Sequence, residues 1–365
     1  MRRLHRAGAA AIIARVTAAS ICRGLRPTAV LLALLAAAPA SATNRLVVAT
    51  WNVENLFDAD DDPDNPGDDE YTRSGWPRWT PERYATKLDH LAEVIAAMKP
   101  DVLGLAEIEN RRVLEDLVRV LREKRHFDLQ AIVHREGGDK RGIDVALLAR
   151  VAPVATNWLA PVPEQRDILI ARFDFGGRPL TVVMNHWKSW AGPPEVNVRI
   201  RTAEARAARA EIERRLAADP RLALLAMGDF NDNVNSAILT GEARFVPWGA
   251  AAGGGAAATL CNLAGCLPET NRATYYYGKD RVWNSFDSIS VTLGMLPGAA
   301  WPAPWRVATN ACGPFVLPQQ RGRDGTPLPF HRVRKKDENG VVRDEYLAGY
   351  SDHFPVRCVL EAAAP

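Results

Sequence analysis

The chain has 365 residues, 47% of them hydrophobic and 24% charged, a composition that excludes disordered, collagen-like and coiled-coil proteins. Its length allows either one large α/β domain or two smaller domains. The net charge of +3 depends on residues 1–42, which hold six arginines and no acidic residue. The remaining residues carry 40 basic and 43 acidic side chains, a net charge of −3. A mildly acidic protein does not attract polyanions through bulk charge, so any phosphate chemistry must be local.

The N-terminal segment has the three parts of an export signal. A basic stretch at residues 2–26 precedes an apolar run at 29–38, and the small-x-small pattern Ala-Ser-Ala follows at 40–42. The apolar run is shorter than the roughly 20 residues that span a bilayer, and no later segment approaches that length, so no transmembrane segment is predicted. An amphipathic N-terminal helix is the alternative. We therefore expect residues 1–42 to be a signal peptide, residues 43–365 to form one domain, and the protein to be periplasmic or secreted.

Cleavage would leave four cysteines, Cys261, Cys266, Cys312 and Cys358. An even number in an oxidising compartment favours disulfides. Three pairings are open, and Cys261–Cys266 is locally the easiest. A zinc site would require closer Cys-x-x-Cys pairs or nearby histidines, which makes it the weaker alternative, and single buried thiols also stay open.

Strands and helices alternate along the chain. Thr80 and Pro81 predict a helix N-cap and first turn, and this helix should end at Met98, before Pro100. Further helices are expected at 110–122, which has one apolar face, and at 197–217. Strands are expected at 46–52, 101–106, 129–133, 143–149, 168–175, 180–185, 222–227, 285–293 and 354–360.

Three segments are expected to be irregular. Residues 249–258 are entirely Gly and Ala, and residues 297–330 are rich in proline. Residues 58–70 carry eight acids in thirteen positions. Closely spaced oxygens suit Ca²⁺, but the spacing matches no EF-hand, so this segment is interpreted as a solvated acidic loop.

Polar residues stand at the ends of five apolar strands. They are Asn52, Glu107, Asn185-His186, Asp229 with Asn231, and Asp352-His353. Carboxylates, amides and imidazoles in such positions are the components of a hard-cation site with acid and base groups. Cysteine, which softer metals recruit, is absent from the set. The pattern favours Mg²⁺, which takes few protein carboxylates and keeps positions open for a substrate phosphate.

Seven motifs give the sequence a resemblance to a known family. They are TWNVENLFD at 50–58, LAEIEN at 105–110, RGIDVALLAR at 141–150, NHWKSW at 185–190, MGDFND at 227–232, FDSISV at 286–291 and GYSDHFPV at 349–356. In this order they resemble the endonuclease/exonuclease/phosphatase superfamily, over residues 45–360 and most closely its exported bacterial branch. The resemblance implies an α/β (α+β) fold, a four-layer αββα sandwich. Two mainly antiparallel sheets would pack face to face between helices, with the site at one end of the sheets.

The resemblance also implies roles for individual residues. Glu107 would be the principal metal ligand, with Asn52 and Asp352 beside it, and the ion would be Mg²⁺, with Mn²⁺ or Ca²⁺ as alternatives. His353 would be the general base that activates water, and Asp287 the carboxylate that orients it. Many members have His or Tyr after this aspartate, whereas this chain has Ser288.

The remaining matched residues would handle the phosphate. Asp229 and Asn231 would position the nucleophile and the scissile phosphate. His186 would donate to a non-bridging oxygen or protonate the leaving group, with Asp144 as its partner. Apart from the resemblance, the cluster of Trp187, Lys188 and Trp190 follows one of the strand ends and is a candidate substrate contact. Core packing is the alternative for the two tryptophans, and Lys188 is the better phosphate contact.

The leading hypothesis is an exported, divalent-metal-dependent phosphodiester hydrolase that acts as a nuclease. A basic stretch at residues 321–336 is the candidate for holding a nucleic-acid backbone. The first alternative is a phosphodiesterase or phosphatase for small or lipid phosphoesters, with Trp301 and Trp305 as candidate membrane contacts, although no amphipathic helix supports them. The second is a non-catalytic binding protein on the same scaffold, which the presence of Glu107 and His353 disfavours. The sequence indicates no protein partner.

Overall fold

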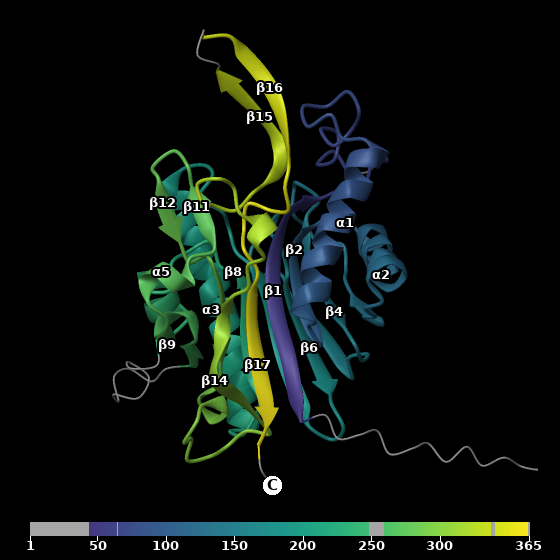
Figure 1. Ribbon diagram of the computed structural model, residues 1–365. Coiled ribbons are helices and arrows are strands. Elements are labelled where there is room, and N and C mark those ends of the chain that lie inside the picture. The colour runs from purple at the N-terminus through teal and green to yellow at the C-terminus, as the bar shows by residue number, and fades with distance from the viewer. Residues whose placement is uncertain (1–43, 64, 248–258, 337–339, 364–365) are drawn as a thin grey trace, which may run out of the picture. The chain divides into compact units, whose positions relative to one another are not determined.

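The structure is a computed structural model that describes residues 44–363 except 64, 248–258 and 337–339 (Figure 1). The predicted signal peptide and the Gly/Ala run at 249–258 lie outside the described residues. Within the described part, no helix is both long enough and apolar enough to cross a membrane.

Two large sheets form the centre of the domain. The first sheet has the strand order β14 (Trp305–Pro314), β17 (Val356–Ala362), β1 (Arg45–Leu56), β2 (Val102–Ile108), β4 (Asp144–Ala149) and β3 (Ala131–Val133). The second has the order β5 (Ala155–Leu159), β6 (Ile168–Asp174), β7 (Pro179–His186), β8 (Leu224–Asp229), β13 (Asp287–Val291), β10 (Leu260–Asn262) and β9 (Phe245–Pro247). Most neighbouring strands are antiparallel; the parallel pairs are β1–β2, β7–β8 and β9–β10.

The remaining elements are helices and two ribbons. The helices are α1 (Pro81–Met98), α2 (Arg111–Arg125), α3 (Pro194–Ala218), α5 (Glu269–Arg272) and the short turns η1 (Ile238–Glu242), η2 (Ala264–Cys266), η3 (Leu293–Met295) and η4 (Pro318–Gln320). The two-stranded ribbons are β11 (Tyr275–Tyr277) with β12 (Val282–Asn284), and β15 (Phe330–Lys336) with β16 (Val342–Ala348).

Four layers result from this order. The core between the sheets is built from inward-facing residues of both, such as Val48, Val182 and Leu225. A second apolar cluster lies between the outer face of the first sheet and helices α1 and α2. A third lies between the second sheet and α3 (Figure 1). The predicted four-layer sandwich, with two mainly antiparallel sheets face to face, is therefore confirmed.

Local signals determine where the helices begin. Thr80 accepts a hydrogen bond from the Arg83 backbone N–H and caps α1, as the sequence predicts. Asn110, predicted as the first helical residue, instead caps α2 by accepting from the Val113 N–H. The prediction of an irregular segment at 297–330 was wrong for β14, which lies inside it. This strand pairs with β17 at the sheet edge, a position that tolerates its flanking prolines.

No disulfide is recorded for the four cysteines of the described residues, and disulfide formation stays a prediction. Cys312 nevertheless lies directly opposite Cys358 in the β14–β17 ladder, and the thiols of Cys261 and Cys266 are hydrogen-bonded neighbours.

Candidate active site

An amide between two carboxylates lies where the sheets meet. Asn52 on β1 donates from Nδ2 to Glu107 Oε1 at 3.2 Å and to Asp229 Oδ2 at 2.9 Å. The three residues come from β1 and from the ends of β2 and β8, where these strands reach the site. Gly228, next to Asp229, allows β7 and β8 to approach closely, because a Cβ there would lie 1.9 Å from the Asn185 carbonyl oxygen. Glu107 has a positive φ of 65°, a strained conformation for a residue other than glycine.

A histidine–carboxylate pair faces this group. His353 Nδ1 donates to Asp287 Oδ2 at 2.6 Å, and His353 Nε2 lies 3.9 Å from Asp229 Oδ2. Two further hydrogen bonds hold the segment: Trp51 Nε1 donates to the His353 carbonyl, and Ser351 Oγ donates to the Asn52 carbonyl. The imidazole is therefore fixed in tautomer and direction, with Nε2 facing the cavity side.

Charge in this site is concentrated and mostly negative. Burial alone lowers the pKa of His353, but the carboxylates of Asp287, Asp229 and Asp352 outweigh it and raise that pKa well above its usual value. Burial raises the pKa of Asp229 to about 6, with a contribution from Asp287. Burial, with the charges of Glu54 and Glu107, raises the pKa of Asp352 to about 7.

His186 also lies close to Asp229 and Glu107. Its Nε2 lies 3.8 Å from Asp229 Oδ2 and 3.9 Å from Glu107 Oε1. Burial and then the nearby Arg166 guanidinium lower the pKa of His186 well below its usual value. The ring is therefore neutral near pH 7, which suits an N–H donor better than an acid.

Asp144 is not the partner of His186 that the resemblance implied. It accepts from the Gly137 backbone N–H and lies 3.4 Å from His134 Nε2, while His186 Nδ1 is buried without a hydrogen-bond partner. Asp144 is the first residue of β4, and the loop before that strand supplies its contacts.

The two predicted substrate contacts differ in placement. Asn231 lines the cavity, with its backbone N–H bonded to Asp229 Oδ1 and its Nδ2 to the Trp187 carbonyl. Lys188 is not among the lining residues, and its Nζ donates to Ser189 Oγ and to the Ala191 carbonyl. In this arrangement Lys188 supports the turn beside the site.

A cavity of about 660 Å³ opens onto the site, and one of its walls is aromatic. Tyr275 packs against the His353 ring with centroids 4.7 Å apart and stacks on Phe286, which stacks in turn on Trp190. Trp190 is 59% exposed and Tyr277 is 42% exposed. Sequence reasoning singled out Trp190 but missed the tyrosines, although the Tyr-Tyr-Tyr run at 275–277 was a visible signal.

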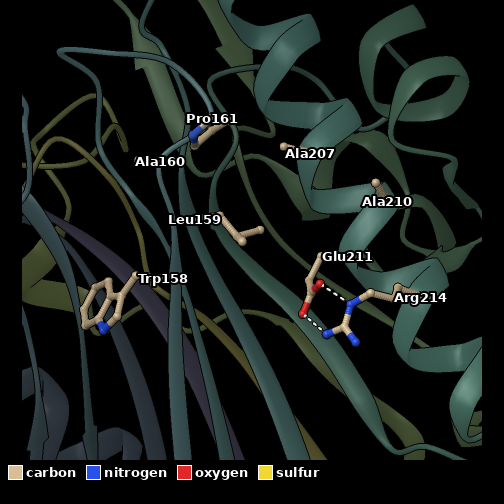
Figure 2. Close-up of a pocket in the computed structure, with 8 residues that line it drawn as sticks. All are labelled: Trp158, Leu159, Ala160, Pro161, Ala207, Ala210, Glu211 and Arg214. Atoms are coloured by element: carbon tan, nitrogen blue, oxygen red, sulfur yellow. Dashed lines mark hydrogen bonds and ion pairs between the residues drawn. The ribbon is translucent and has the colours of Figure 1, made fainter.

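A second hollow, of about 490 Å³, lies between β5 and α3 (Figure 2). It is lined by Trp158, Leu159 and small residues of α3, and its charged members, Glu211 and Arg214, are paired with each other. Because no group there is free to act on a substrate, the active-site candidate is the cavity at His353.

The basic stretch at residues 321–336, predicted to hold a nucleic-acid backbone, is only partly available for binding. Arg332 and Arg334 both pair with Asp344 and lie over the Trp76 ring, while Arg321 lies over Phe354. Trp305 is buried in the core and Trp301 is 74% exposed, so the predicted pair of membrane-facing tryptophans does not form.

The donor set fits a hard divalent cation. Glu107 and Asp352 offer carboxylate oxygens and line the cavity together with Asn52, whose Oδ1 accepts from the Glu54 backbone N–H. Among the described residues, Asp229, Asp287 and His353 also bring ligand atoms within 4.8 Å of one another.

The two-sheet sandwich and a site of carboxylates, an amide and two imidazoles define a metal-dependent phosphoric ester hydrolase. The sequence matches the model of the Endonuclease/Exonuclease/phosphatase family over residues 47–362. The chain belongs to this family, whose members use divalent metals.

Solved structures show the same fold. TDP2 from Caenorhabditis elegans is 15% identical, with a TM-score of 0.53 over 87% of this chain and 75% of that one. D. rerio TDP2 complexed with a single strand DNA product and SmcL are each 16% identical, with TM-scores of 0.51 over 87% of this chain and 99% of theirs. No curated protein sequence matches the chain.

Proposed function

We propose that the protein is an exported, Mg²⁺-dependent phosphodiester hydrolase that cleaves nucleic acid. The observation that carries the reaction type is the buried His353–Asp287 pair, whose free ring nitrogen faces Asp229 beside Glu107 and Asn52. A base oriented in this way next to a cation site is suited to deliver water to a phosphorus atom.

Each residue has a part in the proposed reaction. In its neutral form, His353 Nε2 takes a proton from water, whose oxygen attacks phosphorus as the P–O ester bond breaks, and the leaving alkoxide takes up a proton from solvent. Asp229 and Asn231 orient the water and the phosphate, and the neutral His186 donates an N–H to a non-bridging oxygen. Glu107, Asn52 and Asp352 would hold the cation, which supplies charge neutralisation for the phosphoryl oxygens and for the crowded carboxylates. Fixed donors act where negative charge develops.

The aromatic wall supports a nucleic-acid substrate. Trp190 and Tyr277 present exposed rings beside the catalytic groups, and each base stacked on such a ring contributes about 1–3 kcal/mol of binding free energy. One similar structure, D. rerio TDP2, is complexed with a single strand DNA product. Stacking also suits a mildly acidic protein, because it requires no basic field. Export is proposed from the basic, apolar and small-x-small segments of residues 1–42.

The test is a substrate panel with purified protein lacking residues 1–42. Single-stranded DNA, RNA, a sphingolipid and bis-p-nitrophenyl phosphate are each assayed with Mg²⁺, Mn²⁺, Ca²⁺ or EDTA, with His353→Ala and Asp229→Asn as inactive variants. We expect metal-dependent cleavage of a nucleic acid that both variants lose. Cleavage of bis-p-nitrophenyl phosphate alone would refute the proposed nuclease activity but would still support a phosphodiester hydrolase. Activity on the sphingolipid alone would favour the alternative of a hydrolase for lipid phosphoesters. Equal behaviour of all three proteins would refute the mechanism.

A further inference from the structure

The acidic segment Asp58–Glu70, called here the acidic loop, differs from the solvated loop that its composition predicts. It follows β1, and Asp58 and Asp68 within it are buried. Residue 64 lies outside the description. The loop packs tightly against the turn at residue 141, because a Cβ on Gly67 would lie 2.3 Å from the Arg141 backbone. Burying carboxylates in a packed loop requires a compensating partner.

Three aspartates of the loop converge. Asp61, Asp68 and Asp69 each place a carboxylate oxygen within 4.8 Å of the other two. Across the described ranges, no lysine or arginine forms an ion pair with any of them, unlike Asp58 and Asp60, which contact Arg112. The cluster therefore carries uncompensated negative charge.

Asp68 supplies a second, independent observation. Its side chain is 1% exposed, and Oδ2 accepts from the Asp62 backbone N–H at 2.9 Å. Oδ1 is buried and bonded to no N–H or hydroxyl donor of the described residues, and the side chain that contacts Asp68 is another acid, Glu109, whose pKa is raised to about 8 by burial first and then by the nearby Asp58 and Asp68. An unsatisfied buried acceptor costs about 1–3 kcal/mol, and more when it is charged. The cost adds to the repulsion from Asp61 and Asp69, and either a cation bound at Asp68 or a proton held between Asp68 and Glu109 would relieve it.

The chemistry of the donors selects the ion. All three ligands are carboxylates, and no histidine or cysteine belongs to the cluster, which disfavours softer metals. Asp61 and Asp69 are exposed, so water can complete the coordination. An irregular loop provides the variable geometry that Ca²⁺ accepts and Mg²⁺ does not.

We propose that Asp61, Asp68 and Asp69 form a Ca²⁺ site that shares no ligand with the Glu107 site. The ion would stabilise the segment that follows β1, the strand that carries Asn52. The Tyr71 N–H donates to the Asp68 carbonyl at 2.6 Å, and the Tyr71 ring stacks on Phe57 with centroids 3.9 Å apart. Holding Asp68 in place thus holds the segment that follows β1.

The experiment separates this site from the catalytic one. Calorimetric titration with CaCl₂ is carried out on the chain carrying Glu107→Gln and Asp229→Asn, which removes binding at the active site. We expect one Ca²⁺ per chain, a melting temperature that rises with Ca²⁺ concentration, and at least a tenfold weaker affinity after adding Asp68→Asn. Neither readout depends on activity, so failure of the proposed nuclease would leave this test unaffected.

Control variants decide the other outcomes. Asp60→Asn removes the same charge from the same loop outside the cluster and should leave the affinity within twofold. Asp61→Asn and Asp69→Asn change exposed positions, so they test the site even if Asp68→Asn fails to fold. Absence of Ca²⁺ binding in the parent, unchanged affinity in both exposed variants, or equal weakening by Asp60→Asn would each overturn the proposal.

Discussion

Replacing Asp287 by Asn tests the proposed general base most directly. The substitution keeps the size of the side chain but removes the charge that His353 Nδ1 contacts at 2.6 Å in a fully buried setting. A hydrogen bond to a charged group contributes about 1.5–3 kcal/mol, which corresponds to roughly 10- to 150-fold. Loss of the correct tautomer removes the base as well, and a general base contributes about 10²–10⁴-fold. We expect kcat to fall by about 10²–10⁴ with KM nearly unchanged.

The assay is the pH dependence of kcat on the best substrate of the panel, at saturating metal. Because Asp287 raises the pKa of His353, and a general base is inactive when protonated, the acidic limb of the variant's profile should also shift to lower pH. Asp174→Asn, on the distant β6, serves as the matched control and should retain wild-type rates. The reasoning is refuted if Asp287→Asn keeps kcat within threefold of wild type while its melting temperature is unchanged.

Four further outcomes are expected. Burial raises the pKa of Glu204, which is 1% exposed, from 4.5 to about 7, so its folded pKa exceeds its unfolded one and stability falls as pH rises between these values. In urea unfolding, Glu204→Gln should lose this pH dependence of the free energy of unfolding, which amounts to about 3 kcal/mol. The prediction is contradicted if the free energies of unfolding of the variant and the wild type change in parallel with pH. Trp190→Ala should raise KM for single-stranded DNA about 5- to 150-fold and barely change KM for bis-p-nitrophenyl phosphate; equal changes would argue against stacking. Leu225→Ala, in the core between the sheets, should lower the free energy of unfolding by about 2–5 kcal/mol in urea melts, and a loss below 1 kcal/mol would speak against that packing. Mild oxidation should link Cys312 to Cys358, since opposed antiparallel residues lie within disulfide range, and non-reducing peptide mapping would show a different pairing if the register is wrong.

Much of the molecule follows from local sequence. Thr80 and Asn110 cap helices because a short polar side chain can satisfy the first free N–H groups, which depends only on neighbours in the chain. Buried strands such as β8 are continuous apolar runs, and a polar residue ends them where the sheet ends. The family motifs mark these ends, so the carboxylate, amide and imidazole set at Asn52, Asp229 and His353 could be recognised before any coordinates.

Tertiary structure alone decided which of these groups meet. His353 and Asp287 are 66 positions apart, and Asp287 lies on β13 of the second sheet whereas His353 precedes β17 of the first, so only the packing of the two sheets brings them together. Asp144 instead lies beside His134, which its own position in the chain does not reveal. The burial of Asp68 likewise results from packing of its loop against a turn more than 70 residues later. Composition predicts that a run of acidic residues is solvated. Only the packed fold shows which of these side chains are shielded from water.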